Sequence, residues 1–313
     1  MRPAITALLP IKNGALWTPR IVSNLRACLE PSDQLIIVDD HSTDDSWSIL
    51  SKLDFNFEFT LCSNQGHGLV AALNQGIRLA KHPWIARFDV DDEYPRERLE
   101  LQLSKVEDST VAIFGDYSFV NDSGENLGLM PSPIFPLSTA LSLVHSDRTA
   151  HPSAVFRKSA AIEVGLYREK DFPSEDLSLW IRLLHVGDLT TVPHPVLKYT
   201  LHKNSVSSSR YYEAKARSEE LINSMLDFNR LVPNVEKEFT NYIKAYSNIN
   251  LGRERKILFL RDLLSKVIFS RFTLLFKVRL ISYGLFQLLF PFTLLYLTKL
   301  YIHQKRRQKT RFN

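Results

Sequence analysis

Cysteine is scarce in this chain, with Cys28 and Cys62 the only two among 313 residues. Neither cysteine has the close spacing of zinc ligands, and two cysteines do not make a disulfide framework. We therefore expect buried, reduced thiols. The chain also has no secretory signal ahead of its first apolar run, residues 5–9, which has the character of a strand. Both absences favour a cytoplasmic, reducing location.

Acidic residues are almost absent from the C-terminal end. Residues 1–250 hold 25 Lys and Arg against 32 Asp and Glu, whereas residues 251–313 hold 14 against 2. The net charge of +5 therefore conceals an acidic first part and a strongly basic end. Such an end usually has an anionic partner. A nucleic acid is disfavoured as that partner, because the basic residues are interleaved with long aliphatic runs and form no polar arm.

The basic end also contains a long stretch without charge, residues 281–298. Its 18 positions are at the lower limit for a membrane span, and Gln287 and Pro291 weaken that interpretation. We expect residues 257–302 to form an amphipathic segment in the membrane interface, and residues 303–313 to form a basic tail attracted to anionic lipid. The alternatives are a true span and a helix buried in the core or in an oligomer.

The first hundred residues alternate between strand and helix patterns, which predicts an α/β fold with a mostly parallel, Rossmann-like sheet covered by helices. The predicted strands are residues 5–9, 34–38, 57–62 and 84–88, and the predicted helices are residues 17–29, 47–53 and 69–80. Further along, we expect helices at 96–105, 159–164, 177–186 and from 211 onward, strands at 111–115, 155–156 and 192–201, and a hairpin around 122–124. Because ligands bind beyond the C-terminal ends of parallel strands, we expect the residues that follow the strands to converge on one edge.

Carboxylates cluster at two of these strand ends. Asp39 and Asp40 close the second strand, and Asp89, Asp91 and Asp92 follow the fourth. Three neighbouring carboxylates are costly unless water, a cation or a basic partner neutralises them, so they form a candidate metal site. Taken alone, the first pair also fits a solvated turn or the acid pocket of a phosphoryl-accepting receiver domain. The second group also fits a cap for the following helix.

Five ordered motifs resemble those of the family-2 glycosyltransferases with the GT-A fold. They are residues 9–13, 37–44, 64–66 together with 72–77, 89–92, and 174–176. The resemblance covers residues 4–210 and implies inverting transfer of a sugar from a nucleotide donor to an acceptor hydroxyl. We therefore expect a GT-A domain over residues 1–215 and a helical C-terminal region over residues 216–313.

The resemblance also implies roles for residues on the donor side. Asp39 resembles the acid that binds the nucleotide base, and Pro10 and Asn13 shape the base and ribose pocket. Asp91 resembles the divalent-metal ligand of the DXD motif, and Asp89 the acid that faces the ribose or the metal. The implied ion is Mg²⁺ or Mn²⁺, bound by carboxylate and diphosphate oxygens, and the implied donor is a UDP-sugar. The full set of expected donor-site residues adds a third metal ligand, Asp92, and further contacts of the nucleotide-sugar at Asp40, Asn64, Gly66, Asn74 and His202.

On the acceptor side, Asp176 matches the family's catalytic base, and a partly buried carboxylate beside Glu175 would have its proton affinity raised toward a useful value. The alternative is that this acidic pair only caps the following helix. His151 is interpreted as acceptor-side or structural, and His202 belongs either to a loop that closes over the diphosphate or to a plain surface loop. His41 departs from the family pattern, which usually has glycine there. Histidine tolerates unusual backbone angles, so we expect the turn to survive.

These features predict a hexosyltransferase-type enzyme that is peripheral or monotopic at the inner face of the cell membrane. Its acceptor is expected to be a growing cell-surface glycan, lipid-linked because of the membrane-like tail. Single addition is preferred, because no Gln-x-x-Arg-Trp pattern of processive synthases follows the acidic pair. Two other classes stay open. A non-catalytic nucleotide-binding or scaffold protein would be expected to lose the acids, and a sugar nucleotidyltransferase needs a Gly-rich, basic phosphate loop, which residues 10–15 do not supply.

Overall fold

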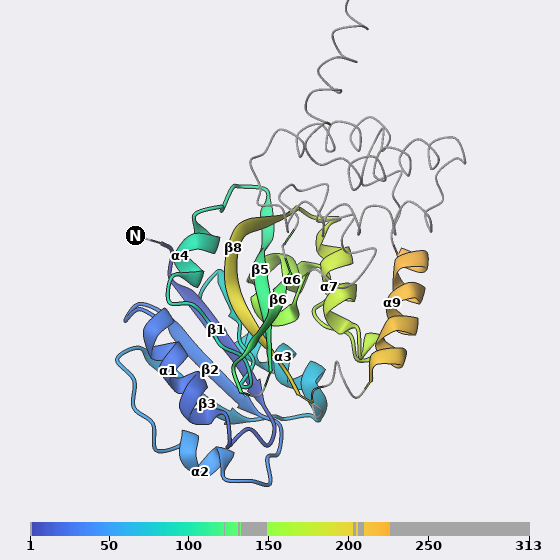
Figure 1. Cartoon of the computed structure of the whole chain (residues 1–313). Coiled ribbons are helices and arrows are strands. Elements are labelled where there is room, and N and C mark those ends of the chain that lie inside the picture. The colour runs from blue at the N-terminus through green and yellow to red at the C-terminus, as the bar shows by residue number, and fades with distance from the viewer. Residues whose placement is uncertain are drawn as a thin grey trace, which may run out of the picture. The chain divides into compact units, whose positions relative to one another are not determined.

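A computed structural model of the chain describes residues 2–121, 123–130, 132, 149–202, 205 and 210–225 (Figure 1). Within these residues an eight-stranded sheet has the order β3-β2-β1-β4-β7-β5-β6, with β8 paired to β5. The strands are β1 (Ile5–Ile11), β2 (Gln34–Asp39), β3 (Glu58–Ser63), β4 (Trp84–Arg87), β5 (Thr110–Asn121), β6 (Asn126–Met130), β7 (Val155–Arg157) and β8 (Asp188–Leu201). The helices are α1 (Thr18–Cys28), α2 (Ser46–Leu50), α3 (Gly68–Leu79), α4 (Arg98–Leu103), α6 (Lys158–Glu163), α7 (Glu175–Leu183) and α9 (Tyr211–Met225), with short 3₁₀ turns η1 (His151–Ser153) and η2 (Glu169–Asp171).

The first four strands are parallel to one another, as the alternating pattern predicts. β1 pairs with β2 and β4, and β2 pairs with β3, all in parallel register. β7 then joins the sheet antiparallel to both β4 and β5, and β6 is antiparallel to β5. The predicted fold class is confirmed: a mixed α/β fold with a mostly parallel central sheet. The C-terminal ends of β1 to β4 therefore lie along one edge.

The sheet is covered by apolar layers on both faces. Every residue of β1 is buried, and alternate side chains point to opposite faces. Leu8 and Ile36 belong to the layer that includes α3, α6 and α7, whereas Leu9 and Ile37 belong to the layer that includes α1 and α4 (Figure 1). Gly76 lets α3 pack closely on β1, because a Cβ at this position would lie 2.1 Å from a methyl carbon of Leu8. With both faces covered, the strand ends are the natural place for a ligand.

β5 and β8 are longer than the sequence pattern predicts. The strand predicted at 111–115 continues to Asn121, and β8 begins earlier than expected. Pro193 and Pro195 interrupt the pattern of β8 because proline cannot donate to the ladder. The pairing of the two strands shifts register at these prolines and then continues. The hairpin predicted around residues 122–124 is confirmed, because β5 and β6 pair antiparallel on either side of it.

Helix α9 crosses the predicted boundary between the GT-A domain and the C-terminal region. Ser174, immediately before α7, has its Oγ 3.0 Å from the carbonyl oxygen of Ala214 and 3.0 Å from the Oγ of Ser218. Arg217 forms a 2.8 Å ion pair with Asp171, which is buried. α9 is therefore packed against the segment that carries α7 and belongs to the same unit.

The predicted membrane segments lie outside the described residues, both the amphipathic stretch at 257–302 and the basic tail at 303–313. The helices that the structure does describe were all too short or too polar to cross a membrane. The membrane interpretation therefore stays a prediction from composition.

Both cysteines are free, as predicted. Cys28 is buried and Cys62 is partly buried. Burial raises the pKa of the Cys28 thiol to about 11 and also raises the pKa of Cys62. Neither thiol is therefore a reactive nucleophile at neutral pH.

Candidate functional site

Asp39 and Asp40, at the end of β2, are both buried. Asp40 Oδ1 accepts hydrogen bonds from Asn64 Nδ2 at 2.7 Å and from the Gly68 N–H at 2.9 Å. Lys12 Nζ lies 3.3 Å from the other oxygen of Asp40. Burial alone would raise the pKa of Asp40, but these partners outweigh it and hold the pKa below its usual value. Asp40 therefore stays charged and ties the loops after β1 and β3 to β2.

The two carboxylate oxygens of Asp39 have different surroundings. Its Oδ2 accepts a hydrogen bond from the Ser42 N–H at 3.1 Å. Its Oδ1 is buried and has no hydrogen-bond partner among the described residues. A buried acceptor without a donor is costly, so a donor group on a bound ligand would relieve that cost. This environment suits the role predicted for Asp39, which is to bind a nucleotide base.

The loops after β1 and β2 are joined by hydrogen bonds, and each loop contains one residue in the left-handed conformation. Asn13 has a φ of 53° and His41 a φ of 57°. Asn13 Oδ1 accepts a hydrogen bond from the Thr43 N–H at 2.8 Å, and Ser42 Oγ accepts one from the Asn13 N–H at 2.8 Å. The prediction that histidine adopts the turn where glycine is usual is therefore confirmed. Pro10, also predicted to shape the pocket, is buried near the end of β1.

Some of the predicted donor-contact residues have hydrogen-bond partners within the protein. Asn64 Oδ1 accepts a hydrogen bond from the Gly66 N–H at 3.0 Å, so these two residues shape the turn before α3. Asn74 contacts the backbone of Tyr167, and its predicted contact with the donor stays a prediction. Its Nδ2 donates to the Tyr167 carbonyl at 2.9 Å, and its Oδ1 accepts from the Tyr167 N–H at 3.0 Å. Both polar atoms of the Asn74 amide thus join α3 to the segment before α7.

Asp89, Asp91 and Asp92 gather just after β4. One carboxylate oxygen from each lies within 4.8 Å of the other two. Burial, and then repulsion from the other two acids, raises the pKa of Asp92 well above its usual range. Burial also raises the pKa of Asp89, against the opposing charge of Arg87. A divalent cation would remove the repulsion, and a set of carboxylate oxygens suits Mg²⁺ or Mn²⁺.

The end of β8 meets these acids. His202 Nε2 lies 2.6 Å from Asp91 Oδ2, and the His202 ring lies 5.0 Å from the Trp17 ring. The Thr200 N–H donates to Asp92 Oδ1 at 2.8 Å. The structure therefore brings His202 to the predicted metal site, although it is 111 positions from Asp91 in the sequence.

Arg87 is a residue of this site that the sequence motifs do not identify. It is 1% exposed, and its Nη2 lies 2.7 Å from Asp89 Oδ1. Its Nη1 donates to the carbonyl of Phe88, and its Nε has no partner among the described residues. A signal was present in the sequence, because Arg87 is the one charge within the apolar run at 84–88. Such a charge needs a partner when it is buried.

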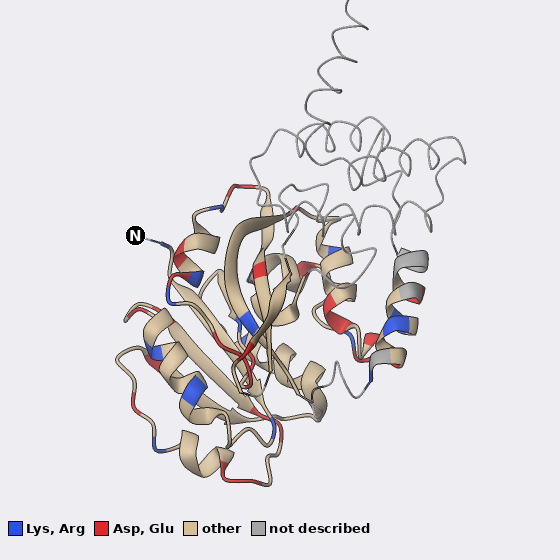
Figure 2. Cartoon of the chain, in the orientation of Figure 1, with Lys and Arg blue, Asp and Glu red and all other residues tan. Residues whose placement is uncertain are grey.

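Glu175 and Asp176 form the acidic first turn of α7 (Figure 2). The side chain of Ser174 makes no capping bond to this helix, whereas Asp176 Oδ1 accepts a hydrogen bond from the Leu177 N–H at 2.7 Å. Burial, and then repulsion from Asp176, raises the pKa of Glu175 to about 8. Burial raises the pKa of Asp176 to about 6, while backbone N–H donors and the Arg87 charge limit the rise. At neutral pH Asp176 is therefore the charged member, which suits a general base.

A buried histidine and tyrosine lie beside Glu175. His151 Nε2 is 2.8 Å from the Tyr167 hydroxyl oxygen, and His151 Nδ1 is 3.9 Å from Glu175 Oε1. Burial, followed by the charge of Arg87, lowers the pKa of His151 well below its usual value. The histidine is therefore neutral. With His151 neutral and Glu175 protonated, Asp176 is the charged member of these three residues.

Comparison with known proteins identifies a family. The family model for glycosyl transferase family 2 matches residues 6–165. An uncharacterized glycosyltransferase of Rickettsia felis is 22% identical over a match that covers 66% of this chain but 35% of that relative's length. The Escherichia coli protein named UDP-Glc:alpha-D-GlcNAc-diphosphoundecaprenol beta-1,3-glucosyltransferase WfaP is 28% identical over 60% of this chain and 73% of its own.

Solved structures share the fold. S. aureus TarS 1–349 in complex with UDP-GlcNAc superposes with a TM-score of 0.58 at 15% identity, covering 84% of this chain and 80% of that one. The mannosyltransferase PcManGT from Pyrobaculum calidifontis, in complex with GDP-Man and Mn²⁺, has a TM-score of 0.56 at 16% identity, covering 92% of this chain and 81% of that one. At these identities the likeness establishes the fold.

Proposed function

Because the chain belongs to the family described as glycosyl transferase family 2, we propose that it transfers a sugar from a nucleotide-sugar donor to an acceptor hydroxyl. The observation that carries this proposal is the presence of two acidic groups with different chemistry. The three carboxylates after β4 suit a donor diphosphate with its metal ion, and Asp176 suits a proton acceptor. A scaffold protein would have no need for both groups.

On the donor side, we propose a UDP-sugar whose base is bound by Asp39 Oδ1. The uridine nucleotides in the TarS complex and in the WfaP name support this choice, whereas PcManGT holds GDP-Man. Asp91, with Asp89 and Asp92, would hold Mg²⁺ or Mn²⁺ through carboxylate oxygens. When bound, such an ion neutralises the charge that develops on the departing nucleotide diphosphate.

Asp176 supplies the base in this proposal. Its carboxylate takes the proton of the acceptor hydroxyl while that oxygen forms a bond to the anomeric carbon of the sugar. The bond from this carbon to the nucleotide diphosphate breaks, and its electron pair leaves with the diphosphate. Attack from the face opposite the leaving group inverts the anomeric carbon. A pKa of about 6 keeps Asp176 charged at neutral pH while it remains a useful proton acceptor.

We propose a growing lipid-linked glycan as the acceptor, with one hexose added in each reaction. The WfaP name specifies a sugar on diphosphoundecaprenol, which supports a lipid carrier. The basic and apolar composition of residues 251–313 suits an anionic membrane surface. We propose accordingly that the enzyme acts from the cytoplasm, peripheral or monotopic at the inner face of the cell membrane, in cell-surface polysaccharide biosynthesis.

The test uses the full chain, a panel of nucleotide sugars, a sugar-diphosphoundecaprenol as the acceptor, and measurement of nucleotide diphosphate release with and without Mn²⁺. D91N should reduce metal-stimulated release by about 100-fold or more, because it removes a ligand for the ion that stabilises the leaving group. The matched control is D108N, which changes an exposed aspartate before β5 and should behave like the native chain. Absence of release from every donor, or undiminished release by D91N, contradicts the proposal.

A further inference from the structure

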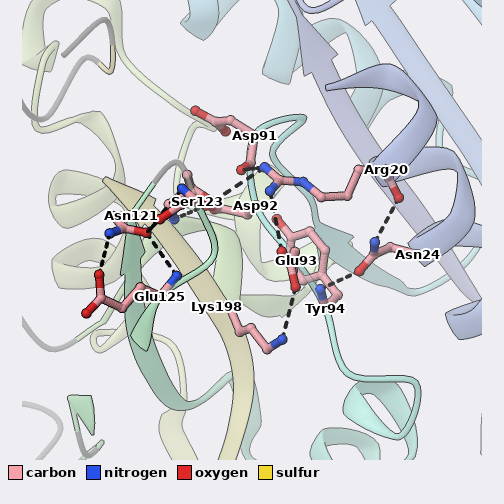
Figure 3. A network of polar contacts seen from close by, with 11 residues as sticks. Arg20, Asn24, Asp91, Asp92, Glu93, Tyr94, Asn121, Ser123, Glu125 and Lys198 are labelled. Carbon is pink, nitrogen blue, oxygen red and sulfur yellow. Dashed lines mark hydrogen bonds and ion pairs between the residues drawn. The ribbon is translucent and has the colours of Figure 1, made fainter. Parts of the chain in front are cut away.

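The acidic loop that follows β4 is fastened to α1 by a charged side chain. Arg20 of α1 reaches across to this loop, as Figure 3 shows. Its Nη1 lies 3.4 Å from Glu93 Oε1, and its Nη2 donates to the main-chain carbonyl of Asp91. The second contact restrains the backbone of a proposed metal ligand without using its carboxylate, which His202 contacts.

The same loop is fastened to β8 from the other side. Glu93 and Lys198 exchange two main-chain hydrogen bonds, of 3.1 Å and 2.8 Å. Lys198 Nζ also lies 3.0 Å from Glu93 Oε2 (Figure 3). The carboxylate of Glu93 is therefore shared between Arg20 and Lys198, with one oxygen bound to each. These cations come from α1 and β8, which are far apart in the sequence.

A third set of contacts fixes the end of the loop. Asn24 Nδ2 donates to the Arg20 carbonyl at 2.8 Å, and Asn24 Oδ1 accepts from the Tyr94 N–H at 2.6 Å. The Tyr94 hydroxyl oxygen in turn accepts from the Asp89 N–H at 2.6 Å. The main chain is thus held at the first acid, at Glu93 and at Tyr94.

We propose that Arg20, Glu93 and Lys198 form a clamp that positions the three acids for the donor, with none of the clamp residues touching the ion. Three carboxylates confined within 4.8 Å repel one another and would spread if the loop were free. The clamp opposes that spreading through charge-assisted hydrogen bonds. The side chains of Arg20 and Glu93 are 30% and 27% exposed, so their substitution does not open the core. The role of the clamp in donor binding rests on the proposed function. The contacts that form the clamp do not depend on it.

Hydrogen exchange of the metal-free full chain tests the clamp directly. E93Q keeps the shape of the side chain and removes both ion pairs, and R20Q removes the link to α1. Each should speed exchange of the amides in residues 88–94 by about tenfold, because restraining charge-assisted bonds are lost. The control is R26Q, since Arg26 lies on the same helix but donates to the Asp54 carbonyl, away from the acids. Exchange in E93Q and R20Q equal to that of R26Q would overturn the clamp.

Binding of Mn²⁺ alone, followed by electron paramagnetic resonance, separates positioning from charge. Removing the positive charge of Arg20 would by itself tighten cation binding. Loss of the positioning of the acids would instead weaken cation binding. We therefore expect about tenfold weaker Mn²⁺ binding by R20Q. We expect the same of R20K, which conserves the charge but lacks the planar guanidinium group of arginine. Unchanged or tighter binding by R20Q overturns the proposal.

A chain that binds Mn²⁺ and shows the clamp effects but transfers no sugar refutes the proposed function alone. Absence of Mn²⁺ binding in the native chain refutes the proposed metal, and exchange then decides the clamp.

Discussion

Glu175 and Asp176 are adjacent in the chain, yet they hold their protons over different pH ranges. Burial raises both pKa values, to about 8 for Glu175 and to about 6 for Asp176. Only the deprotonated form of Asp176 can accept a proton from the acceptor hydroxyl. We therefore expect the rate of sugar transfer to fall as the pH is lowered through about 6, in proportion to the charged fraction of Asp176. Initial rates measured between about pH 5 and 8 test this dependence.

Substitution of each acid separates the two roles. D176N should lower the turnover rate by about 10² to 10⁴, the usual contribution of a general base. E175Q should change it by less than about tenfold, because glutamine resembles the protonated carboxyl that Glu175 carries at neutral pH. Both variants keep the volume of the native side chain, so each serves as the packing control for the other. Equal losses in the two variants would refute this division of roles.

The residues of the site differ in how far sequence could predict them. Asp39 and Asp91 follow apolar strands, and the parallel sheet brings such positions to one edge, so their convergence is predictable. Asn74 lies in a matching motif, but tertiary packing uses its amide on the backbone of Tyr167. In the sequence, Arg87 is only a single charged residue within an apolar run. Its ion pair with Asp89 is seen only in the structure. Pairwise contacts of this kind depend on packing, which a linear pattern does not record.

At the scale of elements, α9 holds the segment that carries the proposed base. Arg217 pairs with the buried Asp171 at 2.8 Å, and Ser218 lies 3.0 Å from Ser174 Oγ, one residue before Glu175. R217Q leaves a buried carboxylate without its cation, so we expect the free energy of unfolding to fall by about 3 kcal/mol. We also expect a severalfold lower turnover rate with donor binding unchanged, because the described contacts of α9 with Ser174 and Asp171 lie next to α7.

Thermal unfolding and separate measurement of turnover and donor KM check this prediction. The control is E213Q on the same helix, which breaks an exposed pair with Arg210 three residues away. Such surface pairs contribute at most about 1 kcal/mol, so E213Q should resemble the native chain. A rise in donor KM with turnover unchanged in R217Q would show that α9 acts on the donor side instead.

The strands show where sequence patterns fail at this scale. β1 to β4 are predictable, because each is a short, largely apolar run that ends in a polar loop. β8 is not, because Pro193 and Pro195 divide its pattern and are accommodated only by a register shift against β5. β7 contributes three residues, Val155–Arg157, and nothing in so short a run specifies that it lies antiparallel between β4 and β5. Its place is set by the strands on either side.

At the scale of the whole molecule, charge is divided along the chain. Residues 1–250 carry an excess of acids, and residues 251–313 carry 14 Lys and Arg against 2 Asp and Glu. An acidic unit is repelled by anionic lipid, so any attraction to such a membrane must come from the basic end. We therefore expect the full chain to float with phosphatidylglycerol vesicles, and a variant lacking residues 252–313 to stay in solution. The unfolding temperatures of the full chain and the deletion variant should be compared, to show that any loss of membrane binding is not caused by a loss of folding.

Charge and apolar contact within the basic end can be separated by removing only charge. Changing Lys305, Arg306 and Arg307 to Gln leaves the charge-free stretch at 281–298 intact. Since each basic residue near an anionic surface contributes about 1 kcal/mol, partitioning into the vesicles should fall by about 100-fold at low salt. Added salt should likewise weaken the binding of the native chain to the vesicles, because salt screens the electrostatic attraction. If the triple variant partitions like the native chain while the deletion does not, apolar contact alone holds the protein on the membrane. If the deletion variant still floats, the anchor lies within residues 1–251.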